Sequence, residues 1–188
     1  MKDLSDLEII ESIRNGNHSD YSLLIDKYKN RAFSMLVRML KNEMDAEDVL
    51  QDSFLKAFNG LRTFKNEAKF STWLYRIVYN TALTRLSGKR RKMENETSSI
   101  EDKPELQSNY DFNTSEKADL NNFINEVIKQ LPPKFASVIN LFYIAGMSCE
   151  EISEVMNITV ASVKVILYRS RNALKDLLIS KDYIKEII

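Results

Sequence analysis

Glycine, proline, cysteine and histidine are scarce in this chain of 188 residues, which has 4, 3, 1 and 1 of them. So few glycines and prolines disfavour a β-sandwich with many tight turns and favour long helices. One cysteine excludes a disulfide framework and a cysteine-rich zinc site, and it fits a reducing, cytoplasmic location. One histidine excludes histidine-rich metal sites and histidine-based triads. We therefore expect a protein without a metal site, a cofactor or enzymatic activity.

Long hydrophobic runs are also missing. The longest candidate, residues 138–147, contains Asn140 and falls well short of the roughly 20 residues that a membrane helix needs. The first six residues are acidic and polar, unlike a secretory signal. With 44% apolar and 29% charged residues, the composition is that of a globular chain of one or two domains without membrane insertion.

Net charge is zero because 27 basic residues meet 27 acidic ones, but the charges are unevenly distributed. Residues 61–93 hold nine basic residues and one acidic residue, and residues 94–126 hold two and nine. Residues 159–181 are basic again, with five against one. Two basic blocks around an acidic one indicate two anion-binding surfaces, although charge runs can also be solvated faces.

Apolar residues repeat at spacings of three and four, which predicts an all-α fold. Asp20 and Ser71 are candidate caps for the second and fourth helices. Residues 94–115 lack periodicity and are rich in Glu, Ser, Asn and Asp, so they predict a flexible acidic linker between two small domains, 1–93 and 116–188. The expected helices span residues 6–14, 21–40, 45–61, 72–86, 116–131, 135–145, 149–156 and 160–178.

The last two helices carry the pattern of a helix-turn-helix. Ser148 stands three residues before Glu151 as in a capping box, Asn157 suits a left-handed turn, and Thr159 can cap the second helix. An ordinary helical hairpin is the alternative. The candidate DNA-contacting residues are Thr159, Val160, Ala161, Ser162, Lys164, Tyr168, Arg169 and Arg171.

The helix expected from Asp45 has an apolar face that includes Ala46 and Phe54. Leu55 falls almost opposite this face, surrounded by Asp48, Gln51 and Asp52. An apolar centre in an acidic patch is typical of a docking site for a basic partner helix, although a single exposed leucine is also ordinary.

Residues 64–92 mix aromatic with basic side chains. Leu74 and Val78 are expected to face inward, and Trp73 lies at the margin. Aromatic rings beside basic groups bind unstacked single-stranded bases, at about 1–3 kcal/mol per base. Trp73 and Phe70 can equally be core residues. The residues expected to point outward are Tyr75, Arg76, Tyr79 and Asn80.

Three segments together carry a resemblance to a known family. DAEDVLQDSFLKAF (45–58), FSTWLYRIVYNTAL (70–83) and the stretch over 131–178 resemble, in order, the polymerase-binding, −10-opening and −35-reading segments of bacterial RNA polymerase sigma factors. The chain is similar to the extracytoplasmic-function group of the sigma-70 family, and the similarity spans nearly all of it. Only the two minimal domains, regions two and four, are matched.

The resemblance implies a factor that binds core RNA polymerase and directs promoter-specific initiation, with an anti-sigma factor as regulator and a monomeric free state. It implies that region two both holds polymerase and melts the −10 element, whereas region four recognises −35 DNA. The core-polymerase contacts implied are Asp45, Asp48, Gln51, Asp52 and Leu55. The −10 contacts implied are Arg62, Lys65, Lys69, Trp73, Tyr75, Arg76, Tyr79 and Asn80.

The chain departs from the family pattern at two places. Val165-Ile166 stands where the family often has Ser-Arg, which removes a customary phosphate contact, and Asn157 stands where it often has Gly. A freestanding DNA-binding regulator with the same helix-turn-helix remains the alternative function, but it leaves the Leu55 patch and the aromatic-basic helix unexplained.

Overall fold

The computed structural model describes residues 4–96 and 126–180. Within these residues every regular element is helical, which confirms the all-α prediction. The expected linker, 94–115, begins inside the last helix of the N-terminal region, and its remainder lies outside the described residues. Most of the helix expected over 116–131 lies outside them too, although residues 126–129 are helical.

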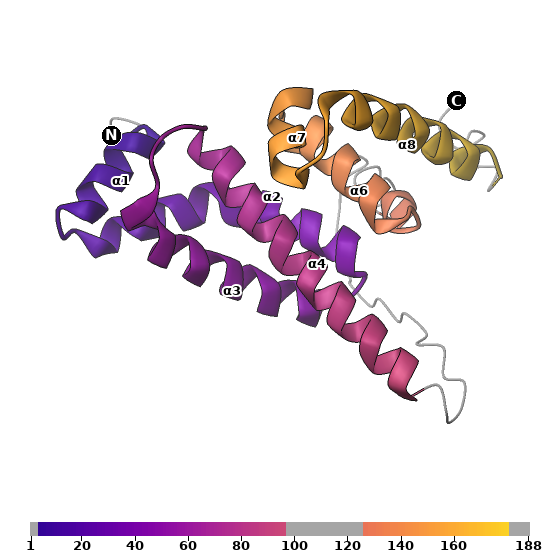
Figure 1. Ribbon diagram of the computed structural model, residues 1–188, viewed down its shortest axis with the longest axis horizontal. Helices are drawn as coiled ribbons and strands as arrows, with labels where there is room; N and C mark the ends of the chain where they lie inside the picture. The colour runs from indigo at the N-terminus through magenta and orange to yellow at the C-terminus, as the bar shows by residue number, and fades with distance from the viewer. Residues whose placement is uncertain (1–3, 97–125, 181–188) are drawn as a thin grey trace, which may run out of the picture.

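The N-terminal region is built around three long helices that pack against one another, α2, α3 and α4, with α1 against α2 (Figure 1). Their buried side chains form its apolar core. In chain order the elements are α1 (Asp6–Arg14), η1 (His18–Asp20), α2 (Tyr21–Leu40), α3 (Glu43–Gly60), η2 (Leu61–Thr63) and α4 (Phe70–Glu96).

Two expected helix starts and one expected helix cap differ from the structure. The third helix begins at Glu43, because the side chain of Asn42 accepts a hydrogen bond of 2.8 Å from the backbone N–H of Asp45. The fourth begins at Phe70, so Ser71 lies inside it. Asp20 precedes α2 without a capping hydrogen bond, since its carboxylate accepts from the hydroxyl of Ser12 instead.

Helix α4 continues through Ser87 and Gly88 to Glu96, well past the expected end at residue 86. A glycine inside a helix costs about 1 kcal/mol relative to alanine but does not force the helix to end. Arg85 and Lys89 on this stretch form ion pairs with Asp45 of α3. These pairs stabilise the extended helix against its neighbour.

The C-terminal region contains α6 (Pro133–Ile139), η3 (Asn140–Ile144), α7 (Cys149–Met156) and α8 (Val160–Ser180). Pro133 opens α6, where its missing N–H costs no helical hydrogen bond. The single helix expected over 135–145 is instead α6 followed by a π-helical turn, in which the N–H of Ala145 donates to the carbonyl of Asn140 at 2.9 Å. Gly146 then ends the segment with a φ of 71°, in the left-handed region that glycine adopts readily.

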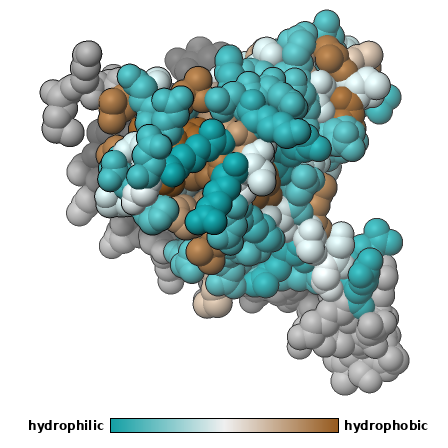
Figure 2. Space-filling model, turned by 60° about the vertical axis from the view of Figure 1, so that its left-hand side comes forward, coloured by the Kyte–Doolittle hydropathy of each residue, from teal (hydrophilic) through white to brown (hydrophobic). Residues whose placement is uncertain are grey.

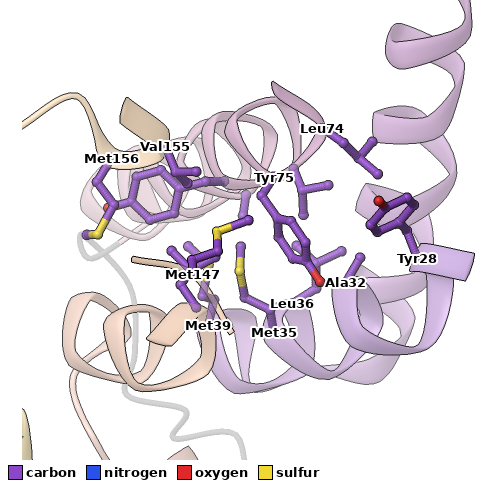
Figure 3. Packing of buried hydrophobic residues seen from close by; sticks show 14 of the residues in the cluster. Tyr28, Ala32, Met35, Leu36, Met39, Leu74, Tyr75, Met147, Val155 and Met156 are labelled. Atoms are coloured by element: carbon purple, nitrogen blue, oxygen red, sulfur yellow. The ribbon is translucent and has the colours of Figure 1, made fainter. Parts of the chain in front are cut away.

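The two regions pack directly on each other, with α7 against α4 and α6 against α2 (Figure 1). Their buried apolar residues form one continuous cluster. Figure 3 shows Met35 and Met39 of α2 in this cluster together with Met147 and Met156 of the C-terminal region. The face in Figure 2 is mainly hydrophilic, with hydrophobic residues showing in small groups between polar ones.

Candidate nucleic-acid and protein interfaces

Leu55 is the most clearly exposed apolar side chain of the N-terminal core helices after Met44, with 64% of its surface accessible. Phe54 and Ala57 on the opposite face of α3 are buried, as the helical wheel predicts. Asp48, Gln51 and Asp52 around Leu55 are exposed. The expected acidic patch with an apolar centre is therefore present on the surface of α3.

Asp45 belongs to the same expected set, but the structure buries it. Its carboxylate accepts hydrogen bonds from Arg85 Nη2 at 2.7 Å and Nε at 3.0 Å, and it also pairs with Lys89. Burial disfavours the charged form, but the hydrogen bonds from Lys89 and Arg85 outweigh it and lower the pKa of Asp45. Asp45 therefore joins α3 to α4 more than it presents charge to a partner.

A groove of about 660 Å³ runs between α3 and α4 beside these ion pairs. Its charged lining includes Asp48, which Arg85 also contacts at 2.9 Å, and Asp52, which Lys56 pairs with at 2.6 Å. The sequence reading missed Arg85 and Lys89. Their spacing of four on the helix opposite the acidic stretch was the signal that could have found them.

The loop between α3 and α4 exposes Arg62, Lys65 and Lys69. Arg14 of α1 supports the start of this loop, donating to the carbonyl of Leu61 from Nε at 3.1 Å and from Nη2 at 2.8 Å. Its Nη2 also donates to the carbonyl of Phe64. The loop is thus anchored to α1, while the side chains of Arg62 and Lys65 are exposed and can face a polyanion. Sequence reasoning missed Arg14, because nothing local links it to a loop almost 50 residues away.

Trp73 lies half-buried in a cluster of aromatic rings. Its ring centroid is 5.0 Å from that of Phe64 and 5.7 Å from that of Phe70, and the ring of Phe70 also contacts Tyr28 at 5.6 Å. Gly60 makes room for it, because a Cβ there would lie 2.9 Å from the indole. Phe70 is therefore core, and Trp73 packs against that core at the base of the basic loop.

The expectation that Tyr75 and Tyr79 point outward is wrong, since they are only 2% and 5% exposed. The helical wheel allowed α4 one buried face, but α2 and α3 cover one side of the helix and α7 covers another. Burial raises the pKa of Tyr75 to about 12. Arg76 and Asn80 are exposed as expected.

The helix-turn-helix has the expected local structure. Ser148 and Glu151 form a reciprocal capping box, and Asn157 ends α7 in the left-handed conformation with a φ of 52°. Thr159 caps α8 by accepting from the N–H of Ser162 at 3.2 Å. Ile152 of α7 and Val163 of α8 are completely buried between the helices. Each local prediction for this unit is confirmed.

The first turns of α8 present the expected polar and basic groups. Ala161, Ser162, Lys164 and Arg169 are exposed, Tyr168 is 65% exposed, and Val160 is half-buried. Of the Val165-Ile166 pair, which departs from the family pattern, Val165 is on the surface and Ile166 is in the core.

Arg171 is held in place by aromatic residues. Its Nε donates to the hydroxyl of Tyr143 at 2.7 Å, and its guanidinium lies over the rings of Phe142 and Tyr143 at 5.7 and 5.5 Å. Such stacking orients an arginine that remains exposed. Sequence reasoning gave Arg171 a phosphate-contacting role and missed these packing partners.

Among the described residues, an ion pair joins the N-terminal and C-terminal regions. Lys69 Nζ, at the start of α4, lies 2.8 Å from Glu151 Oε1 on α7. Partial burial of Glu151 favours its neutral form, but the hydrogen bonds from Lys69 and from the backbone of Ser148 outweigh this effect and lower its pKa. The same pairing raises the pKa of Lys69. Lys69, which the sequence predicts to contact DNA, therefore forms an ion pair with the C-terminal region.

Two features were searched for in the described ranges 4–96 and 126–180: a metal-binding cluster and a membrane-spanning helix. These ranges contain no cluster of three or more potential metal-ligating side chains. They also contain no helix long and apolar enough to cross a membrane.

An all-helical fold with a helix-turn-helix in its C-terminal region is typical of DNA-binding proteins. Family comparisons agree: Sigma-70 region 2 matches residues 24–92, and Sigma-70 region 4 matches residues 124–174. The chain belongs to the extracytoplasmic-function (ECF) sigma factors of the sigma-70 family, which act in transcription initiation and are not enzymes.

Similar proteins match over nearly their whole length. The ECF RNA polymerase sigma-E factor of Haemophilus influenzae is 30% identical over 184 residues, covering 92% of this chain and 95% of that protein. The ECF sigma factor SigW of Bacillus subtilis is 34% identical over 173 residues, covering 88% and 92%.

Solved structures support the fold. The sigma factor RpoE of Bartonella quintana, in complex with the anti-sigma factor NepR, superposes with a TM-score of 0.69 at 18% identity, covering 85% of this chain and 96% of that one. CnrH, in complex with the cytosolic domain of CnrY, gives a TM-score of 0.62 at 24% identity, covering 92% and 96%.

Proposed function

We propose that this ECF sigma factor is a promoter-specificity subunit that binds core RNA polymerase through α3, opens the −10 element with the α3–α4 loop and α4, and recognises −35 DNA with α8. The observation that carries the proposal is Leu55, a large apolar side chain 64% exposed at the centre of an acidic patch. An apolar anchor with a polar rim is the anatomy of a protein interface. Asp48, Gln51 and Asp52 form that rim, and Asp45 supports it from beneath.

The −10 element is bound, in this proposal, by Arg62, Lys65 and Lys69 of the loop with Arg76 and Asn80 of α4. Flipping or unstacking a base costs a few kcal/mol. Basic groups along the strand and stacking on Trp73 offset this cost. Tyr75 and Tyr79 join the contact only after a change in packing, since both are buried in the free protein.

The −35 element is read by the exposed start of α8. Thr159, Val160, Ala161 and Ser162 are small or short enough for the helix to approach base edges closely, and Lys164 and Tyr168 reach further. Arg169 and Arg171 bind phosphates and set the register of the helix. Because Ile166 is in the core, phosphate contact depends more heavily on these two arginines.

An anti-sigma factor is the proposed regulator, and the free protein is proposed to be a cytoplasmic monomer. The solved relatives RpoE and CnrH are in complexes with NepR and with the cytosolic domain of CnrY, and the former is named an anti-sigma factor. The exposed Leu55 patch suits such a partner as well as it suits polymerase, because an apolar anchor can bind either one. The two partners would therefore compete for Leu55.

The docking claim is tested by Leu55→Asp combined with Asp52→Lys, measured as affinity for core polymerase with helicity as the folding control. We expect binding to fall by at least 30-fold, since losing a hot-spot side chain costs about 2 kcal/mol or more. Leu7→Asp is the matched control, because Leu7 is also exposed, at 45%, but lies on α1. Unchanged affinity of the double variant would refute docking through α3.

The alternative function, a freestanding regulator, is distinguished from a sigma factor by mixing the protein with promoter DNA in the presence and absence of core polymerase. A sigma factor produces transcripts that start at defined sites, which sequencing of their 5′ ends locates. A freestanding regulator binds its operator equally well with and without polymerase.

A further inference from the structure

We propose that an apolar row on the exposed face of α8, made of Ala161, Val165 and Tyr168, reads the methyl groups of thymines in the −35 element. Val165 is the central residue of this row and the one that determines its specificity. This inference rests on the proposed function and deepens it, because it names the chemical feature of the base sequence that α8 selects.

The first argument is the position of the row on the helix. At about 100° per residue, Ala161, Val165 and Tyr168 lie within about 60° of one another around the helix axis. Val163 and Leu167 lie on the other side and are buried. Helix α8 packs there against α6 and α7 (Figure 1). The row therefore faces away from the core, on the side of the helix that can enter a groove.

The second argument is exposure. Val165 is 49% exposed, Tyr168 is 65% exposed, and Ala161 is also exposed. None of the three belongs to the apolar cluster of the described residues. A single exposed apolar side chain is ordinary in a folded protein. Three in line over two turns of a DNA-facing helix form an apolar surface that the rest of the described chain does not cover.

The third argument is the charge on either side of the row. Residues 160–172 contain three basic residues and no acidic one. By the same helical geometry, Lys164 and Arg171 flank the row on one edge, and Arg169 flanks it on the other. Phosphates border the major groove on both sides in the same way, so these cations direct the row toward base edges. This arrangement favours DNA over an apolar protein partner.

The chemistry of the groove then identifies the ligand. The C5-methyl group of thymine is the apolar group that bases present in the major groove, and small apolar or aromatic side chains contact it. The seven residues from Ala161 to Tyr168 span about 10 Å of helix, against about 3.4 Å for each base-pair step. We therefore expect thymines, on either strand, at two or three adjacent base pairs.

The first experiment finds these base pairs. The probe is a pool of duplexes whose upstream element is randomised, selected with the full chain bound to core polymerase. We expect thymine to be enriched at adjacent positions, and Val165→Ser to lose the enrichment at one of them while the others remain. Selection without thymine enrichment, or the same enrichment by both proteins, would overturn the proposal.

The second experiment removes only the methyl group, by placing deoxyuridine at the thymine that Val165→Ser no longer selects. We expect the affinity of the wild-type holoenzyme to fall about fourfold, because burying one such group contributes about 0.8 kcal/mol. The Val165→Ser holoenzyme should bind both duplexes equally. Unchanged wild-type affinity, or full methyl dependence in the variant, would contradict methyl reading.

Ile179→Ser is the matched control, because it makes the same kind of change on the same helix. Ile179 is 50% exposed and lies about 21 Å beyond Val165 along the axis, past the part of α8 proposed to enter the groove. We expect its holoenzyme to keep the wild-type affinity and the wild-type methyl dependence, with helicity measured for all three proteins. An equal loss in both variants would assign the effect to the stability of α8 and overturn the proposal.

The proposed function and the methyl reading fail separately. If α8 does not bind −35 DNA, Arg169→Ala leaves DNA affinity unchanged, as does every base substitution in the upstream element. If only the methyl reading is wrong, Arg169→Ala still weakens binding, and deoxyuridine has no effect. If a protein partner covers the row instead, Val165→Ser leaves DNA affinity unchanged, which also overturns the proposal.

Discussion

Asp45 and Leu55 lie on the same helix, but their surroundings give them different tasks. Asp45 is 7% exposed and bound by two cations of α4, and Leu55 is 64% exposed with no apolar cover. A helical wheel places both residues but does not say which neighbour covers which arc. The docking patch is therefore centred on Leu55, and Asp45 holds the helix that presents it.

Asp45→Asn is expected to lower the free energy of unfolding by about 1–2 kcal/mol near neutral pH, because hydrogen bonds to charged groups are lost. The folded-state pKa of Asp45 lies below its ordinary value of 3.8, so this stability is present above that pH and is lost as the pH falls further. Urea titrations across pH should show the two proteins converging in acid. Asp26→Asn, at an exposed pair with Lys29, should change stability by less than about 0.5 kcal/mol.

At the scale of elements, the packing of α3 on α4 depends on close approach at one position. Gly60 faces the indole of Trp73, and a Cβ there would lie 2.9 Å from it. Gly88, within α4, has no neighbour within 4 Å of such a Cβ. The same substitution should therefore have opposite effects at these two glycines.

Gly60→Ala is expected to destabilise by about 1–3 kcal/mol, as for other overpacked sites, and to shift the emission of Trp73, the single tryptophan. Gly88→Ala is expected to stabilise by about 0.5–1 kcal/mol, because alanine favours the helix. Denaturant titrations followed by tryptophan fluorescence measure both. A stabilised Gly60→Ala protein would show that the indole moves without cost.

Helix α8 carries two arginines with different surroundings. Arg169→Ala should weaken −35 binding nearly equally on all DNA sequences. It should also reduce the slope of the logarithm of the binding constant against the logarithm of the salt concentration by about one unit. Arg171→Ala should do the same and also lower the melting temperature, because its bond to Tyr143 is lost. Binding measured over a salt series, together with thermal melts, separates the two effects. Equal melts for both variants would contradict the packing role of Arg171.

At the scale of the whole molecule, the N-terminal and C-terminal regions share one apolar cluster. Regions of a protein that share an apolar core tend to unfold together, because unfolding either region exposes apolar side chains of the other to water. A defect in the C-terminal region should therefore be felt in the N-terminal region.

Ile152→Ala, at a side chain with no exposed surface, should cost about 2–5 kcal/mol. We expect the unfolding midpoint reported by Trp73, in the N-terminal region, to fall by several degrees with it. Fluorescence and circular dichroism should give coincident transitions. If Trp73 reports an unchanged midpoint, the two regions unfold independently and the shared cluster contributes little.

The sequence by itself determined what depends on neighbours along the chain. It predicted the all-helical class, the capping box at Ser148, the left-handed Asn157, the cap at Thr159 and the exposed Leu55, because helical periodicity and local hydrogen bonds are encoded within a few residues. Only the tertiary structure decided the burial of Tyr75 and Tyr79, the ion pairs of Asp45 and the meeting of Lys69 with Glu151. These features arise between residues up to about 80 positions apart, and they depend on which helix covers which face, a choice that no local pattern contains.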